Sequence, residues 1–157
     1  MTEQPIQRAA SGQARIAVVN GASGGIGFAL VRELLADSNV AMVFATSRHA
    51  STDTRLAKLA VNETTARLRA LDMDVTDEVS VAATAASIGA AVEQLDLIVN
   101  CAGLLHAGSG LQPEKRLADV TPENLQHSFA VNAVGPLLIG KHFQTLLHRQ
   151  QRAVFAS

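Results

Sequence analysis

The stretch that decides the fold is Arg15-Ile16-Ala17-Val18-Val19-Asn20-Gly21-Ala22-Ser23-Gly24-Gly25-Ile26-Gly27, an apolar run that enters a glycine-rich turn. Gly21 lets the chain leave the run sharply, and Gly25 and Gly27 carry no side chain that would block a close approach. If a helix follows, its first backbone N–H groups and its dipole form a site for a phosphate group. Alternatively, the glycines only make a tight connection between a strand and a helix. The position of the turn after the first apolar run favours phosphate binding.

The segments around this turn alternate between strand and helix patterns. Ile16–Val19 predicts a buried strand, and Gly25–Ala36 predicts a helix with one apolar face. That face is expected to hold Ile26, Ala29, Leu30, Leu34 and Ala36. Further strands are expected at Val40–Thr46, Ala66–Asp72, Leu95–Asn100 and Arg152–Ala156, and further helices at Thr54–Val61, Asp77–Glu93 and Glu123–Arg149.

This alternation predicts an α/β fold, in which a doubly wound parallel sheet of Rossmann type lies in the middle of three α/β/α layers. A flavodoxin-like sheet fits five alternating strands as well. Thr76 and Thr121 are candidate helix caps, and Pro136 should kink the long last helix or be absorbed there. We expect residues 1–14 to form a flexible lead-in and residues 15–157 to form one dinucleotide-binding domain that is incomplete at its C-terminal end.

Composition narrows the class of protein. The chain has 157 residues, of which 48% are hydrophobic and 17% charged, which is ordinary for a globular domain. A net charge of −1 gives no electrostatic reason to expect nucleic acid or an anionic membrane as a partner, and no apolar run approaches the ~18 residues of a membrane span. Cys101 is the one cysteine, which excludes an internal disulfide and fits a cytoplasmic location. The histidines lack metal-ligand spacing, so no metal site is expected.

Three more segments share the order of a known family. With the glycine-rich turn, Asp74-Val75-Thr76, Asn100-Cys101-Ala102-Gly103 and Asn132-Ala133-Val134-Gly135 resemble the short-chain dehydrogenase/reductase family from about Arg15 to Ser157. The stretch Cys101–Leu117 is similar to the carbonyl reductase subgroup related to C-factor and sniffer. The resemblance implies hydride transfer between a nicotinamide coenzyme and a small carbonyl or alcohol substrate. It also implies a homodimer or homotetramer that pairs through the Glu123–Arg149 helix.

The same resemblance implies which residues contact the coenzyme. The turn residues would hold the diphosphate, Asp74 and Val75 would face the adenine, and Asn100, Ala102 and Gly103 would pass beside a ribose. Asp74 has a second interpretation as a helix cap or loop residue, and Asn100 as a structural residue. The expected coenzyme-binding residues are therefore Gly21, Ser23, Gly25, Ile26, Gly27, Ser47, Arg48, Asp74, Val75, Asn100, Ala102 and Gly103.

The segment around Arg48 indicates which of the two nicotinamide coenzymes to expect. An enzyme that uses NAD usually carries an acid after the second strand, where it accepts from the ribose hydroxyls. No acid occurs from Val40 through Thr52, and Arg48 can instead form a charge-assisted contact with a 2′-phosphate. We therefore expect NADP rather than NAD, with a solvated surface arginine as the alternative.

The catalytic residues of the family are only partly legible. The family uses a serine after the fifth strand and a Tyr-x-x-x-Lys pair, yet the sequence contains no tyrosine. Asn132 matches the asparagine that holds a water in the proton relay, with a helix-kink residue as the alternative. Ser157 lies at the end of the fifth apolar run, at or just before the catalytic serine. We expect a carbonyl reductase whose active site is completed beyond Ser157; a non-catalytic NADP-binding module or an inactive truncated product is the alternative.

Overall fold

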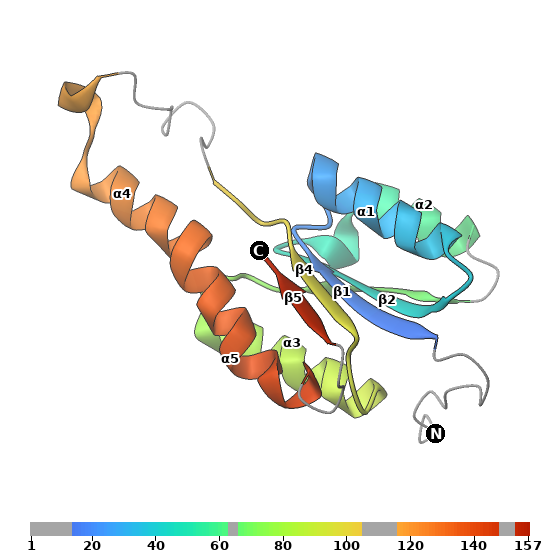
Figure 1. Ribbon diagram of the computed structural model, residues 1–157. Helices are drawn as coiled ribbons and strands as arrows, with labels where there is room; N and C mark the ends of the chain where they lie inside the picture. The colour runs from blue at the N-terminus through green and yellow to red at the C-terminus, as the bar shows by residue number, and fades with distance from the viewer. Residues whose placement is uncertain (1–13, 63–65, 105–115, 148–152) are drawn as a thin grey trace.

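Five parallel strands form the centre of the molecule (Figure 1). The computed structural model describes residues 14–62, 66–104, 116–147 and 153–157. The strands are β1 (Arg15–Asn20), β2 (Val40–Ser47), β3 (Leu68–Asp72), β4 (Leu97–Asn100) and β5 (Val154–Ala156). Their spatial order is β3-β2-β1-β4-β5, and every neighbouring pair is parallel. The chain winds in one direction from β1 to β3 and in the other from β4 to β5, which confirms the Rossmann-type prediction and excludes the flavodoxin-like order.

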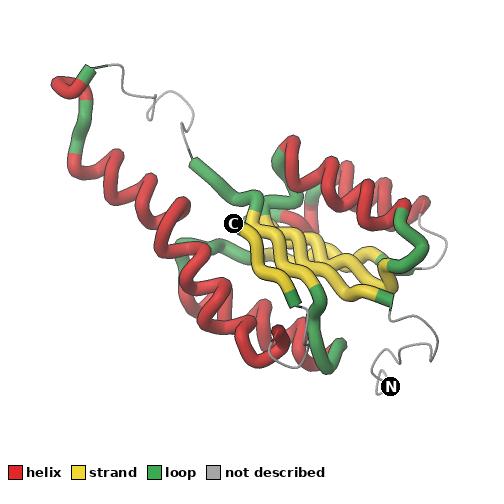
Figure 2. The backbone as a smooth tube through the Cα atoms, viewed as in Figure 1, coloured by secondary structure: helices red, strands yellow, loops and turns green. Residues whose placement is uncertain are grey.

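Helices cover both faces of this sheet (Figure 2). One layer consists of α1 (Gly25–Ala36) and α2 (Thr54–Asn62), and the opposite layer of α3 (Glu78–Ala91) and α5 (Gly135–Leu147). Because both faces of the central strand β1 are covered, its interior is continuously apolar, and Ile16, Ala17, Val18 and Val19 are all at most 2% exposed. The three-layer arrangement that the sequence predicts is confirmed.

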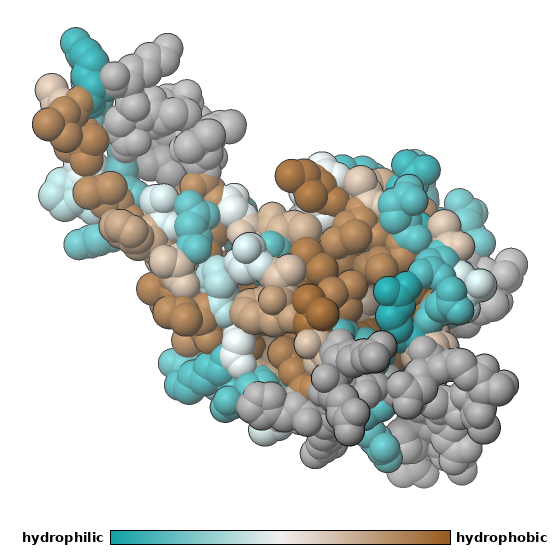
Figure 3. Space-filling model, in the orientation of Figure 1, coloured by the Kyte–Doolittle hydropathy of each residue, from teal (hydrophilic) through white to brown (hydrophobic). Residues whose placement is uncertain are grey.

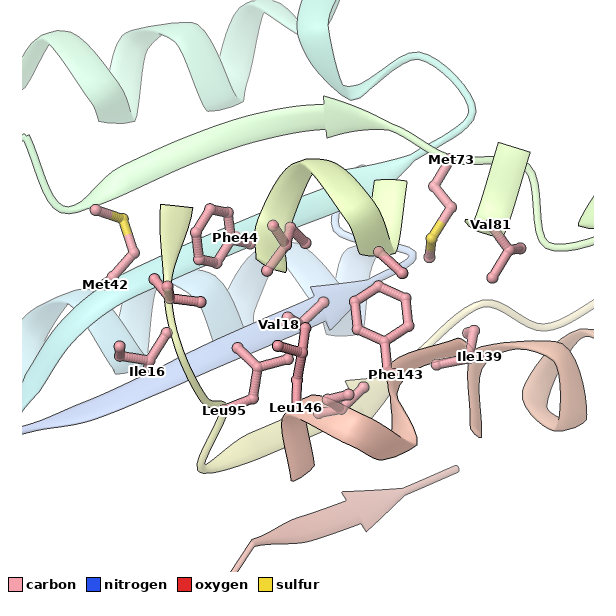
Figure 4. Close-up of a cluster of buried hydrophobic side chains, with 14 of the residues drawn as sticks. Ile16, Val18, Met42, Phe44, Met73, Val81, Leu95, Ile139, Phe143 and Leu146 are labelled. Carbon is pink, nitrogen blue, oxygen red and sulfur yellow. The ribbon is translucent and has the colours of Figure 1, made fainter. Parts of the chain in front are cut away.

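Two apolar clusters fill the spaces between the layers. On the α3 and α5 side, Val18 and Phe44 of the sheet pack with Phe143 and Leu146 of α5 and Val81 of α3 (Figure 4). On the other side, the alternate residues of the same strands pack against α1 and α2. Successive residues of each strand therefore serve different clusters, as the side-chain period of a strand requires.

The buried face of α1 differs from the predicted one. Val31, Leu34 and Leu35 are buried, whereas Ile26 is 80% exposed and Ala29 and Ala36 are exposed. The prediction began the helical period at Ile26, but Gly27 is the residue that contacts the preceding turn and so sets which side faces the sheet. The apolar Ile26 is left on the outside.

Helix ends were predicted with mixed success. Thr121 caps α4 (Pro122–Phe129) as expected, with its hydroxyl oxygen accepting from the Asn124 N–H at 3.2 Å. The prediction of Thr76 as the cap of α3 is wrong. Asp77 caps that helix, and its carboxylate accepts from the Val79 N–H at 3.0 Å.

The long last helix is divided into three parts. α4 is followed by a π-helical turn, η3 (Ala130–Val134), and then by α5, in which Pro136 occupies the second position. The proline lies just after this π-helical turn, and the helix continues past it, so Pro136 is absorbed. Two short 3₁₀ turns, η1 (Ala50–Thr52) and η2 (Leu117–Asp119), complete the described elements.

One end of the molecule carries apolar surface. α4 extends away from the sheet (Figure 1). Hydrophobic residues, brown in Figure 3, lie on the surface of α4 and on the side that carries β5. The exposed apolar residues here are Leu125 and Phe129 of α4, Val134 of η3, Leu137 of α5, and Val154 and Phe155 of β5. In the described part of the chain, no helix has both the length and the apolarity to cross a membrane.

Candidate functional site: a pocket at the carboxyl ends of the strands

A pocket of about 590 Å³ opens at the carboxyl ends of β1, β2, β3 and β4. β1 and β4 are neighbours whose following segments leave in opposite directions, and ligands of open α/β sheets bind at such a switch point. The pocket is lined by Asn20, Gly21, Ser23, Gly24, Ser47, Arg48, His49, Thr52, Asp53, Met73, Asp74, Val75, Thr76, Cys101, Ala102, Gly103, Leu104, His127 and Val131.

The glycine turn brings three segments together without side chains between them. Gly21 has φ +75°, and a Cβ there would lie 2.5 Å from the backbone nitrogen of Ala102. A Cβ on Gly27 would overlap the carbonyl oxygen of Gly21. Both positions therefore require glycine, Gly21 for its backbone conformation and its contact with the β4 loop, and Gly27 for the contact between α1 and the turn.

The start of α1 is open to a ligand. Gly24 is its N-cap and has no side chain that could cap the first N–H groups, and the first helical turn holds no acid. A Cβ on Gly25 would meet no atom within 4 Å. The first N–H groups of a helix have no partner within it, so this end offers donors and a positive dipole to an anion.

The end of β2 adds two polar groups. Ser47 is 7% exposed, and among the described residues its hydroxyl has no hydrogen-bond partner. Arg48 is exposed at the rim and lines the same pocket. A buried hydroxyl without a partner is costly in a folded protein, so a ligand hydroxyl or phosphate oxygen would complete it.

Asp74 contributes a negative charge to the opposite wall. Its Oδ1 accepts from the Thr76 N–H at 2.9 Å and from the Thr76 hydroxyl at 2.7 Å, which closes the turn before α3. The Thr76 hydroxyl, together with the positive fields of Arg48 and His127, holds the pKa of Asp74 below its usual range. Asp74 is therefore a loop carboxylate that lines the pocket, and Asp77 takes the capping role.

A row of hydrogen bonds joins four strands behind the pocket. The Thr46 hydroxyl donates to Asn20 Oδ1 at 3.1 Å, and Asn20 Nδ2 donates to Asn100 Oδ1 at 2.6 Å. Asn100 Nδ2 then donates to the Ser157 hydroxyl oxygen at 3.1 Å. We call Thr46, Asn20, Asn100 and Ser157 the polar row. It positions Asn100 as a structural residue and places Ser157 at the same edge as the pocket.

Asn132 fixes the loop that follows β4. Its Oδ1 accepts from the Leu104 N–H, and its Nδ2 donates to the Leu104 carbonyl oxygen, both at 2.7 Å. The same amide group donates to the Ser128 hydroxyl at 3.1 Å. The π-helical turn holds Asn132 at this position, where the Leu104 backbone and the Ser128 hydroxyl satisfy its amide. Its part in a proton relay stays a prediction.

The structure brings most of the predicted coenzyme residues together. Eight of them line the pocket, namely Gly21, Ser23, Ser47, Arg48, Asp74, Val75, Ala102 and Gly103. Gly25, Ile26, Gly27 and Asn100 lie beside or behind it, with Ile26 on the exposed side of α1. The roles of all these residues in coenzyme binding stay predictions.

Sequence reasoning missed several pocket residues. Thr52 and Asp53 come from the segment after β2, and His127 comes from α4, about half the chain away from that segment. Only Asp53 gave a signal, since an acid before a helix pattern is a capping candidate. Cys101 also lines the pocket, and burial raises the pKa of its thiol, which agrees with a packing residue. Over the described ranges, no three His, Cys, Asp or Glu side chains gather closely enough to hold a metal ion.

Comparisons with known proteins agree with this geometry. Residues 15–155 match the family model described as short chain dehydrogenase. The oxidoreductase YxjF of Bacillus subtilis is 28% identical over 137 residues, which cover 87% of this chain and 49% of that protein. An NADPH-bound carbonyl reductase from chicken fatty liver is 30% identical with a TM-score of 0.75, over 90% of this chain and 55% of that one. Carbonyl reductase Sniffer of D. melanogaster, at 23% identity, a TM-score of 0.75 and coverage of 90% and 59%, shows the shared fold. The chain thus spans about half the length of the proteins it matches.

Proposed function

The chain belongs to the short-chain dehydrogenase/reductase family, and we propose that it binds NADP as the coenzyme-binding part of a carbonyl reductase. The observation that carries the proposal is the open start of α1 next to Arg48 in one pocket. The N–H groups at the start of α1 suit the diphosphate of this coenzyme, and the Arg48 guanidinium suits its 2′-phosphate. NADPH is bound by one of the solved relatives, the carbonyl reductase from chicken.

The residues present fit such a coenzyme. The turn amides would hold the diphosphate, and Arg48 and Ser47 would contact the ribose phosphate. Asp74 and Val75 would line the adenine site, and Ala102 with Gly103 would pass beside the other ribose. The bound coenzyme supplies a hydride to a small carbonyl substrate, and the protein must supply the proton.

The base for that proton is proposed to follow Ser157 in the gene. The sequence has no tyrosine, and the chain matches the N-terminal portion of its relatives. Reading the codons after Ser157 tests this proposal, because a Tyr-x-x-x-Lys in the next few tens of residues supports a reductase. A stop codon there supports the second candidate, a module that binds NADP without turnover.

Coenzyme binding is tested by titration calorimetry of the folded chain with NADPH and NADH. Arg48→Asp should weaken NADPH binding by at least about tenfold, since a charge-assisted contact becomes a repulsion, and leave NADH binding nearly unchanged. Arg32→Gln, at an exposed position of α1, is the control for loss of a positive charge. Equal losses for both coenzymes would remove Arg48 from the 2′-phosphate site, and a folded chain that binds neither would contradict the proposed function.

The exposed apolar residues of the last helix support self-association. We propose a homodimer or homotetramer that covers Phe129 (60% exposed) and Leu137 (73% exposed), because water-exposed side chains of this size favour burial. In sedimentation velocity, the wild-type chain should associate and Phe129→Glu should remain monomeric. A cytoplasmic location is proposed as well, since the one cysteine forms no internal disulfide, and a fluorescent fusion in cells tests it.

A further inference from the structure

Arg55, at the start of α2, contacts the glycine turn from outside the pocket. Its guanidinium donates to the carbonyl oxygen of Ser23 and pairs with the Asp53 carboxylate at 3.2 Å. The guanidinium carbon also lies 4.8 Å from the centre of the Phe28 ring. The Arg55 side chain thus contacts the glycine turn, the first turn of α1 and the segment after β2, although half of its own surface stays exposed.

The bond to Ser23 matters because the other end of the same peptide unit is fixed too. The N–H of Gly24, which belongs to the Ser23–Gly24 peptide, donates to the Gly21 carbonyl oxygen at 2.9 Å. A trans peptide is planar, with its N–H and C=O pointing in opposite directions. Holding both ends therefore fixes the orientation of this peptide, and with it the amides that follow at the start of α1.

Arg55 also neutralises a carboxylate at the pocket wall. Asp53 lines the pocket, and its Oδ1 accepts from the N–H groups of Arg55 at 2.8 Å and Leu56 at 3.1 Å. Unpaired, this carboxylate would repel a diphosphate nearby. The Arg55 side chain offsets that charge from the other side of the turn.

From these contacts we infer that Arg55 is a positioning residue for diphosphate binding: it fixes the glycine turn through the Ser23 carbonyl and screens Asp53. The inference rests on the proposed function, since it names how the turn of that same pocket is held. It differs from the role of Arg48, which would act on the 2′-phosphate alone. Arg55 should matter equally for NADPH and NADH, because both carry the diphosphate.

The test measures the affinity of three ligands for the folded chain by titration calorimetry. Arg55→Gln should weaken NADPH and NADH by about tenfold each, and leave adenosine 2′-monophosphate, which has no diphosphate, within about twofold. Arg55→Lys keeps the charge without the planar fork and should lose about threefold for both coenzymes. Arg32→Gln is the matched control and should leave all three affinities unchanged.

The alternative outcomes separate the explanations. Unchanged coenzyme affinities in Arg55→Gln would overturn the inference, and so would losses confined to NADPH and adenosine 2′-monophosphate, which would assign Arg55 to the 2′-phosphate. Equal losses for all three ligands would show a general structural effect and overturn it as well. If Arg55→Gln does not fold, the same comparison is made with Arg55→Lys. A wild-type chain that binds neither coenzyme would contradict the proposed function itself. That result is read from the wild-type chain, so it is distinct from any result of the variants.

Discussion

Two regions of the molecule differ in how their surfaces are completed: the side of the sheet covered by α1 and α2, and the end formed by β5 and α4. On the first side, the Arg67 guanidinium donates to the carbonyl oxygens of Leu35, Asp37 and Val40, which ties the end of α1 to the start of β2. At the second end, Val154 and Phe155 of β5 are 51% and 38% exposed, and the apolar residues of α4 face outward. The comparison shows that the α1 and α2 side is tied together by internal hydrogen bonds, whereas the β5 and α4 end exposes apolar side chains to solvent.

The largest expected effect on stability comes from α5, which has both a buried and an exposed apolar side chain. Phe143 of α5 is fully buried and Leu137, six residues earlier, is 73% exposed. Phe143→Ala should lower the free energy of unfolding by about 4 kcal/mol, because it leaves a cavity in the core. Leu137→Ala should change it by less than about 0.5 kcal/mol. Urea denaturation of both variants measures the contrast, and similar losses would show that α5 is packed on both sides in solution.

A somewhat smaller loss is expected in the glycine turn. Gly27→Ala places a Cβ on the Gly21 carbonyl oxygen, which should cost about 3 kcal/mol of stability and abolish coenzyme binding. Gly25→Ala meets open space, so the fold should keep its stability while a ligand that approaches this point is weakened. Thermal unfolding and NADPH titration of the pair separate the two roles. A stable Gly27→Ala variant would mean that the turn is looser than the structure has it.

Disrupting the polar row should cost less stability than either of the two destabilising changes above. Asn20→Ala removes the acceptor of the Thr46 hydroxyl and the donor to Asn100, both of which are buried. Leaving these groups without partners should cost about 2 kcal/mol. Gln144→Ala, at an exposed position of α5, is the control and should cost less than about 0.5 kcal/mol in the same denaturation experiment. Equal small losses would show that water replaces the missing amide.

The smallest effect is a dependence on pH. The Asp72 carboxylate accepts from the Ser51 N–H and hydroxyl, each at 2.8 Å, and these bonds hold its pKa below the ordinary value of 3.8. Its folded-state pKa is lower than its unfolded one, so the stability it adds is present above that ordinary value and is lost as the pH falls through the folded pKa. Asp72→Asn should flatten this acid-side decline in denaturation curves between about pH 5 and pH 2. An unchanged decline would remove Asp72 as a contributor.

The elements were predictable because their patterns are local. The span of α1 agrees with the prediction at both ends, since a glycine turn starts the helix and its apolar content continues to Ala36. Which face of α1 is buried was not predictable, because the contact between Gly27 and the turn sets it. Similarly, Thr76 and Asp77 are both good capping residues, and only the geometry of the Asp74 turn decides between them.

The candidate site divides in the same way. Gly21 and Arg48 could be placed at the site because each directly follows a strand, and the ends of parallel strands meet at one edge. Asp74, two residues after β3, was expected there from the family resemblance. His127 and Arg55 carried no such signal, since they reach the pocket and the turn from helices whose placement depends on the whole fold. The π-helical turn that aims Asn132 at Leu104 likewise depends on packing between distant segments.

By itself, the sequence determined the order of strands and helices, the family, and the position of the glycine-rich turn, because strand period, helix period and glycine spacing act over a few residues. The tertiary structure alone decided which faces are buried, how Thr46, Asn20, Asn100 and Ser157 join across four strands, and that Arg55 reaches Ser23. Those contacts join residues far apart along the chain, and their geometry exists only after the layers have packed.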